Sequence, residues 1–85
     1  MQLHNYECMS MDKVTIILIP KGQKTVIAVR YEDSNPPLEI RQQVLKIIEE
    51  HCNNSTQQIT CVTELTSISL EEFKERCFEI ARQCT

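Results

Sequence analysis

The residues of this chain that could support metal or thiol chemistry are five cysteines and two histidines. Structural zinc sites usually contain cysteine pairs at short spacing, such as Cys-x-x-Cys, because a short loop brings two thiolates to one ion. The two cysteines closest in sequence, Cys77 and Cys84, are two turns apart on a predicted helix, which separates them by about 10 Å. Two ligands so far apart would chelate one ion poorly, and we therefore predict no metal site and no other cofactor.

A cysteine nucleophile needs a histidine within hydrogen-bonding distance and a lowered thiol pKa. Cys52 directly follows His51, and successive side chains on a helix point about 100° apart, so this pair lacks the required geometry. The adjacent glutamates at 49–50 and 71–72 lie on polar helix faces, where no apolar surroundings would raise a carboxyl pKa. We predict no catalytic residue and no enzyme activity. A thiol- or metal-dependent enzyme is the least favoured alternative.

The composition excludes several other classes of protein. A single glycine, Gly22, cannot supply a Gly-rich phosphate-binding loop. The net charge of −3 disfavours a nucleic-acid-binding domain, which usually carries a clustered positive face. No apolar stretch approaches the about 18 residues of a membrane-spanning helix. No basic N-terminal region precedes an apolar one, as it would in a secretory signal. We expect a cytoplasmic protein that does not associate with membranes.

Three cysteines occupy positions where the local pattern calls for an apolar residue. Cys61 lies in a predicted strand, whereas Cys77 and Cys84 lie on the apolar face of a predicted helix. A reduced cysteine behaves as a small apolar side chain. We therefore predict that these three thiols are buried and unreactive, and that Cys8 is the most accessible thiol.

A β-hairpin is the clearest element in the first half of the chain. Two segments rich in β-branched residues, 13–20 and 24–31, flank Gly22, which can adopt the positive φ of a tight turn. A turn at residues 21–22 would pair Leu18 with Thr25. Residues 1–12 show no sustained period, so we expect a loosely structured leader there and a single domain over 13–85. Methionines at positions 1, 9 and 11 leave the native start open.

Two helices and a third strand follow the hairpin. An apolar stripe at helical spacing begins after Pro37, with Ser34 or Asn35 as a candidate cap, and ends near residue 52. Residues 58–65 alternate as in a strand. Ser69 begins the second helix, because a glutamate three residues later completes a capping box. The apolar face of this helix is formed by Leu70, Phe73, Cys77, Ile80, Ala81 and Cys84.

The element order β-β-α-β-α predicts an α+β domain of two layers. We expect a three-stranded, mainly antiparallel sheet with both helices packed on one face. The favoured strand order is 2-1-3, with the third strand next to the first. The alternative order is 1-2-3, in which a right-handed crossover through the first helix sets the third strand parallel to the second.

This arrangement would leave one apolar sheet face without a cover. The hairpin strands are apolar on both faces, whereas a sheet with helices on one side should have a polar second face. Either a layer within this chain or another chain could cover this face, and exposed aliphatic surface usually indicates association. We therefore predict a small accessory or regulatory protein that acts by binding protein, through the bare face or a sheet edge and as a homodimer. The predicted interface residues are Ile17, Ile19, Val26 and Ala28.

Nucleic-acid binding is the alternative function. It would use the basic residues of the hairpin, because cations in a sheet-based binder contact phosphates. The expected stacking aromatics are missing from the predicted sheet face, which is aliphatic. The candidate contact residues are Lys21, Lys24 and Arg30.

Overall fold

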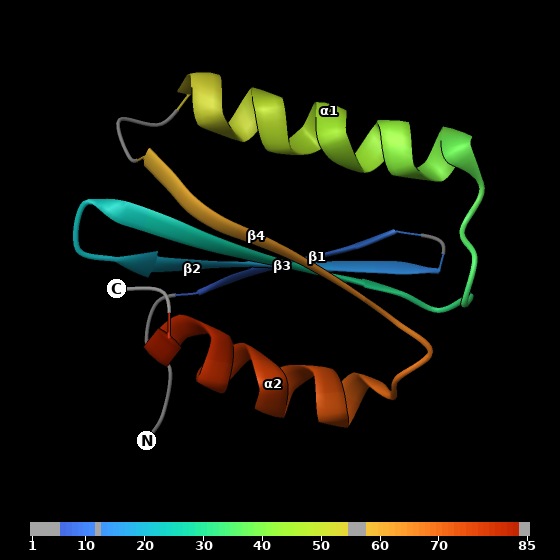
Figure 1. The fold of residues 1–85 in the computed structure, drawn as a ribbon. Helices are drawn as coiled ribbons and strands as arrows, with labels where there is room; N and C mark the ends of the chain where they lie inside the picture. Colours follow the sequence, from blue (N-terminus) through green and yellow to red (C-terminus); the bar gives the residue numbers. More distant parts are fainter. Residues whose placement is uncertain (1–5, 12, 55–57, 84–85) are drawn as a thin grey trace.

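Four strands and two helices form the fold in this computed structural model, which describes residues 6–11, 13–54 and 58–83 (Figure 1). The elements are β1 (Glu7–Met11), β2 (Val14–Lys21), β3 (Lys24–Tyr31), α1 (Leu38–Asn54), β4 (Gln58–Thr66) and α2 (Leu70–Gln83). The predicted α+β class with two helices is confirmed. The sheet has one strand more than predicted, however, and it is mixed.

The strands lie side by side in the order β1-β2-β3-β4. The first three strands pair antiparallel, and β4 pairs parallel to β3. The favoured order, with the third predicted strand beside the first, is therefore wrong, and the alternative order is correct for those three strands. A parallel pair needs a long connection, and helix α1 supplies it by carrying the chain from the end of β3 back to the start of β4.

Strand β1 occupies residues 7–11 of the segment 1–12 that we expected to be loosely structured, and residues 1–5 and 12 of that segment lie outside the described residues. Its side chains alternate between the two faces of the sheet: Met9 and Met11 pack against the core under α1, whereas Cys8 and Ser10 are exposed. The strand pairs with β2 from Glu7↔Leu18 to Met11↔Val14. It was missed because its five residues carry none of the β-branched or aromatic side chains that identify strands.

The hairpin of β2 and β3 is confirmed, but its register differs from the predicted one. Lys21 pairs with Lys24, so the two loop residues are Gly22, with φ of +66°, and Gln23. Leu18 consequently faces Ile27 instead of Thr25. The shift is two residues, and side chains alternate with a period of two, so each residue keeps the face that the sequence predicted.

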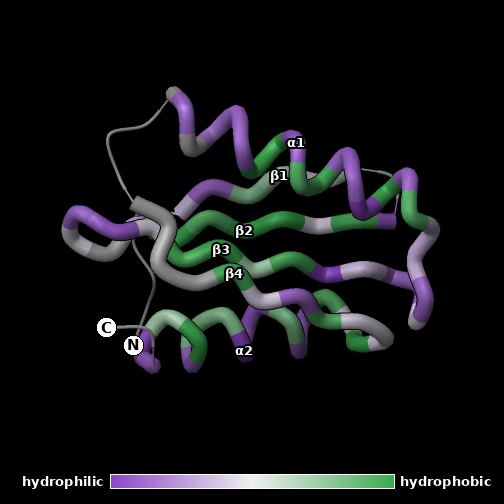
Figure 2. Tube along the Cα trace, turned by 45° about the horizontal axis from the view of Figure 1, so that its top comes forward, coloured by the Kyte–Doolittle hydropathy of each residue, from purple (hydrophilic) through white to green (hydrophobic). Residues whose placement is uncertain are grey.

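The two helices cover opposite faces of the sheet and create three layers (Figure 1). The prediction that both helices pack on one face is therefore wrong. The middle parts of strands β2 and β3 are hydrophobic, whereas the helices alternate between hydrophobic and hydrophilic residues (Figure 2). A strand pair that is apolar on both faces must be covered on both. Helix α1 contributes Val44 and Ile48 to one core, and α2 contributes Phe73, Cys77 and Ala81 to the other.

The hydrogen bonds at the helix starts identify the cap residue of each helix. In α2 the backbone N–H of Glu72 donates to Ser69 Oγ at 3.1 Å, as the capping box predicted. In α1 the carbonyl of Pro37 accepts hydrogen bonds from the N–H groups of Ile40 (3.1 Å) and Arg41 (3.2 Å). In α2 the N–H of Phe73 makes the same bond to the carbonyl of Ser69 at 2.9 Å. Pro37 therefore holds the cap position in α1 that Ser69 holds in α2, and the predicted caps Ser34 and Asn35 lie before it.

Candidate protein interface

The four residues predicted to form an exposed interface belong to the core. Each is at most 2% exposed, because α2 covers this face within the same chain. The second sheet face is aliphatic, as the sequence indicates, but α2 of the same chain covers it. These four side chains are therefore buried within the chain and do not form an exposed interface.

The basic residues of the hairpin do not form one patch among the described side chains. Lys24 is exposed at the start of β3, whereas Arg30 is half-buried near its end. Six residues of strand separate them by about 20 Å. Arg30 Nε donates a hydrogen bond to the carbonyl of Ile68 at 2.8 Å, which ties the loop between β4 and α2 to the sheet. The side chain of Lys21 lies outside the described residues.

Helix α1 covers its sheet face unevenly. At the β1 edge, Met9 and Met11 are partly buried and pack against the core under α1. At the other edge, Val62 pairs with Ile27 and Glu64 with Val29, so both side chains lie on the α1 face. Val62 and Glu64 are nevertheless exposed. The α1 face of β4 is therefore left uncovered.

One side of α1 lies next to this uncovered strip. The buried phenol of Tyr31 donates a hydrogen bond to the Glu64 carboxylate, and its pKa is raised by burial first and by the charge of Glu64 second. The charge of Arg41 acts on the same phenol and lowers its pKa, so Arg41 lies near the end of β3 where Tyr31 bonds to Glu64 of β4. Leu45 is one turn beyond Arg41 on that side, and Leu38 is two turns before Leu45.

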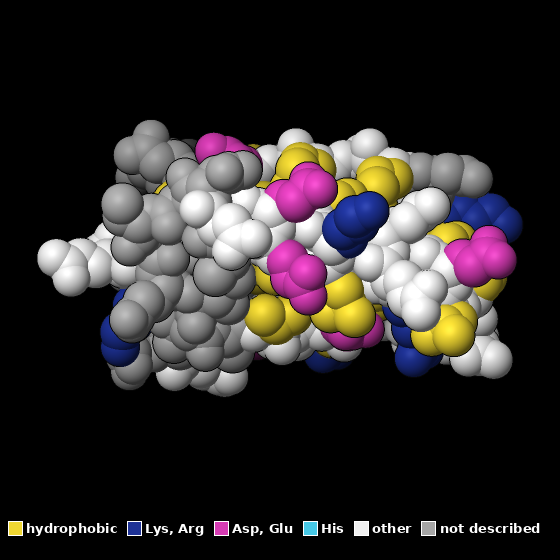
Figure 3. Space-filling model, turned by 90° about the horizontal axis from the view of Figure 1, so that it is seen from above, with side chains coloured by type: hydrophobic (Ala, Val, Ile, Leu, Met, Phe, Trp, Pro, Cys, Tyr) yellow, Lys and Arg dark blue, Asp and Glu magenta, His cyan; other side chains and the backbone are white. Residues whose placement is uncertain are grey.

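Exposed apolar side chains concentrate at this edge. Seen from the α1 side, the molecule shows hydrophobic patches between charged side chains of both signs (Figure 3). Among the described residues, the exposed large hydrophobics are Tyr6, Leu38, Leu45, Val62 and Leu70. Three of them, Leu38, Leu45 and Val62, belong to α1 and β4. We call these three residues, together with the free edge of β4, the β4 surface.

Strand β4 is also the longer of the two edge strands. It has nine residues against five in β1, and its outer edge has no strand neighbour in the described part of the chain. Native edge strands are usually protected by charges, prolines or short length, because free N–H and C=O groups can pair with another chain. Between Gln58 and Thr66 the only charged residue is Glu64, and there is no proline. This edge is therefore competent for pairing.

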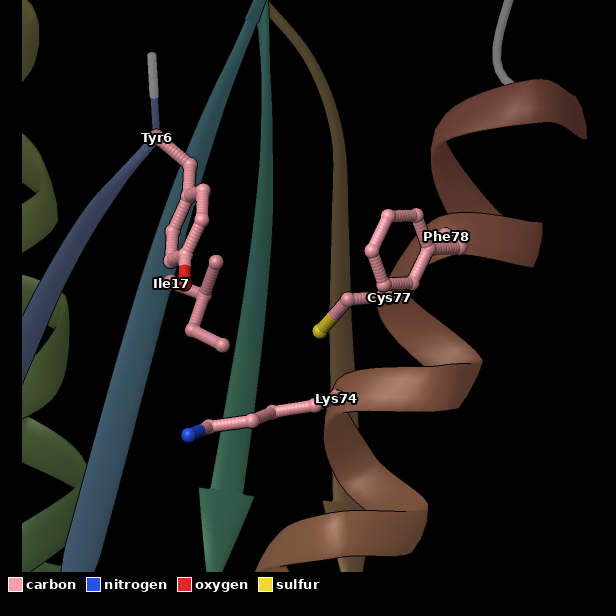
Figure 4. Close-up of a pocket in the computed structure, with 5 residues that line it drawn as sticks. All are labelled: Tyr6, Ile17, Lys74, Cys77 and Phe78. Atoms are coloured by element: carbon pink, nitrogen blue, oxygen red, sulfur yellow. The ribbon is translucent and has the colours of Figure 1, made fainter. Parts of the chain in front are cut away.

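A small pocket lies on the other face of the sheet, where α2 stops short of β1 (Figure 4). Its lining residues are Tyr6, Ile17, Lys74, Cys77 and Phe78. Burial raises the pKa of the Cys77 thiol to about 11, and the charge of Cys8 contributes less. The thiol is therefore neutral near pH 7 and lines the pocket as an apolar group.

The structure tests part of the cysteine prediction. Cys77 is buried and Cys8 is exposed, as predicted, and both are free thiols. The side chains of Cys52, Cys61 and Cys84 lie outside the described residues. Within the described ranges no three His, Cys, Asp or Glu side chains come together as metal ligands, and no helix there is long and apolar enough to span a membrane.

Comparisons with protein-family models, with curated proteins and with solved structures found no match to this chain.

Proposed function

We propose that this protein is a non-catalytic accessory or regulatory protein that acts by binding protein, and that its β4 surface binds a second copy of the chain. The observation that carries the proposal is the position of Leu38, Leu45 and Val62 beside a long, free strand edge. Main-chain hydrogen bonds along such an edge give affinity, and the exposed side chains beside it give specificity. A second copy that paired with the free edge would also bury the aliphatic side chains beside it, and both effects would stabilise the dimer.

Antiparallel pairing of two β4 strands about a two-fold axis would satisfy this surface. The two sheets would join into one continuous sheet, and each copy would present the same residues to the other, as a two-fold interface requires. Two Glu64 carboxylates would face each other directly only if the axis passed through Glu64. An axis at a neighbouring residue such as Thr63 would instead place Val62 of each copy opposite Glu64 of the other.

A charge placed on the β4 surface tests the proposal. Val62→Lys should convert the dimer to a monomer, because an edge lysine opposes strand pairing and removes apolar contact. Leu70→Lys is the matched control: Leu70 is 42% exposed against 45% for Val62, but it begins α2 on the other face. Sedimentation velocity between about 1 and 100 μM should show wild type and Leu70→Lys at about 20 kDa, twice the chain mass of 9.9 kDa.

Two results would contradict the proposal. The first is a wild-type monomer over the whole concentration range. The second is a Val62→Lys variant that dimerises as strongly as the control. Salt-sensitive binding of DNA or RNA by the wild type, lost in Lys24→Gln, would support the alternative function instead.

A further inference from the structure

The pocket between β1 and α2 has an apolar floor and a charged residue at its rim. Helix α2 packs on β3 and β2, so the face of β1 beyond it stays open. Ile17 of β2 forms the floor, and Cys77 points its sulfur toward Ile17 from the helix (Figure 4). The rings of Tyr6 and Phe78 lie on the sheet side and the helix side of the opening.

The size of the pocket limits what can fill it. Its volume is about 60 Å³. Sites for cofactors and drug-sized ligands are typically about 300 to 1,000 Å³, so this pocket is too small for such a molecule. It matches a single aliphatic side chain. Single apolar side chains inserted into pockets are the usual anchors of protein–protein interfaces.

The charge at the rim indicates what should accompany the anchor. Lys74 extends from α2 across the opening toward β2 (Figure 4). Lys74 is exposed, and among the described side chains it forms no ion pair, whereas Lys13 pairs with Asp33. An ammonium group beside an apolar pocket favours a partner that carries a carboxylate next to its apolar side chain.

We propose that this pocket is an anchor site for a segment of another protein, which inserts one aliphatic side chain and places an adjacent acidic residue against Lys74. The site is distinct from the β4 surface, because it lies at the opposite edge of the sheet and on the opposite face. A dimer formed through β4 would therefore keep both pockets accessible.

Two blocked dipeptides, acetyl-Leu-Glu-amide and acetyl-Leu-Gln-amide, are suitable probes. Titrated into the ¹⁵N-labelled full chain, both should shift the amide signals of Ile17, Lys74 and Cys77 at millimolar concentration. The Glu probe should bind about 2- to 5-fold more tightly, the range expected for an exposed ion pair. Lys74→Gln should remove this difference, whereas Lys46→Gln, an exposed lysine on α1, should preserve it.

Tyr6→Ala provides a second test, because Tyr6 precedes β1 and is 44% exposed, so its loss should leave the fold intact. This variant should weaken binding of both probes equally. Absence of shifts at the pocket with either probe would overturn the site, and equal affinity of the two probes would overturn the role of Lys74. Neither result bears on the Val62→Lys experiment, which tests the dimer separately.

Discussion

Burial is the main cause of the pKa shifts of two titrating groups among the described residues. Both the Cys77 thiol and the Tyr31 phenol have raised pKa values, and burial is the larger cause for each. A buried acid with a raised pKa favours the folded state only while it stays protonated. These two residues therefore link stability to alkaline pH.

The free energy of unfolding should fall between about pH 9 and pH 11. Below pH 9 the Cys77 thiol is neutral in both states, whereas above it the unfolded chain ionises first, since the folded pKa is about 11 against 9.0. This difference between the folded and unfolded pKa values of Cys77 lowers the free energy of unfolding by roughly 2 to 3 kcal/mol at high pH. The raised pKa of Tyr31 lowers it further. Urea unfolding at several pH values measures this, and Cys77→Ala should flatten the decline.

Cys8→Ala is the control for this experiment. Cys8 is exposed and contributes less than burial to the Cys77 pKa, so its removal should change the pH profile only slightly. A Cys77→Ala profile as steep as that of wild type would show that the thiol does not carry the effect.

At the scale of the elements, α2 depends on one cap and one anchor. Ser69 accepts the capping hydrogen bond from Glu72, and Phe73 is fully buried against the sheet. Ser69→Ala should lower the free energy of unfolding by about 1 kcal/mol. Phe73→Ala should lower it by about 3 to 5 kcal/mol, because it leaves a cavity under the helix. Chemical denaturation measures both values.

Ser34→Ala is the matched serine control. Ser34 was a candidate cap for α1, but the first turn of that helix is bonded to the Pro37 carbonyl. Ser34 is exposed, so its substitution should change stability by less than about 0.5 kcal/mol. A loss at Ser34 equal to that at Ser69 would contradict the assignment of the caps.

Local patterns predicted the elements from Val14 onward, because each pattern reports which side of a strand or helix is apolar. They also predicted the cap at Ser69 and the burial of Cys77. They could not fix which strands pair, since that depends on contacts between distant segments. The placement of α2 on the second sheet face was not predicted, because the apolar pattern of Ile17 and Val26 fits a cover from the same chain as well as one from another molecule.

The candidate surfaces were less predictable than the fold. Val62 was expected in a strand, but its exposure depends on β4 being an edge strand that α1 does not cover at Val62. Tyr6 belonged to a segment expected to be unstructured. The sequence signal for β1 was an alternation of apolar and polar side chains over residues 8–11. This signal is weak, because none of these residues favours strands.

At the scale of the whole molecule, the two helices are displaced toward opposite edges of the sheet. On the α1 face, side chains of β1 are partly buried against the core whereas Val62 and Glu64 of β4 are exposed. On the other face, α2 packs on β3 and β2, and Cys8 and Ser10 of β1 are exposed. A four-stranded sheet is wider than one helix, so a single helix per face must leave a strip uncovered. The two proposed binding surfaces are these two strips.

The parallel pairing of β3 with β4 also sets an order of events during folding. Strands β1, β2 and β3 follow one another through short connections, so their contacts form at little cost in loop entropy. Strand β4 must wait for residues 32–57 to be organised, and long-range parallel pairing is slow. During that interval the edge of β3 is open to mispairing with other chains.

Helix α1 should therefore be docked in the folding transition state, and α2 should pack later. Val44→Ala removes a buried contact of α1 and should slow refolding, whereas Phe73→Ala should mainly accelerate unfolding. Stopped-flow kinetics in urea separates the two effects, and the opposite assignment of rates would reverse the order. On a ribosome, the sheet would remain incomplete until the last third of the chain had emerged, which makes nascent chains the form of this protein most prone to aggregation.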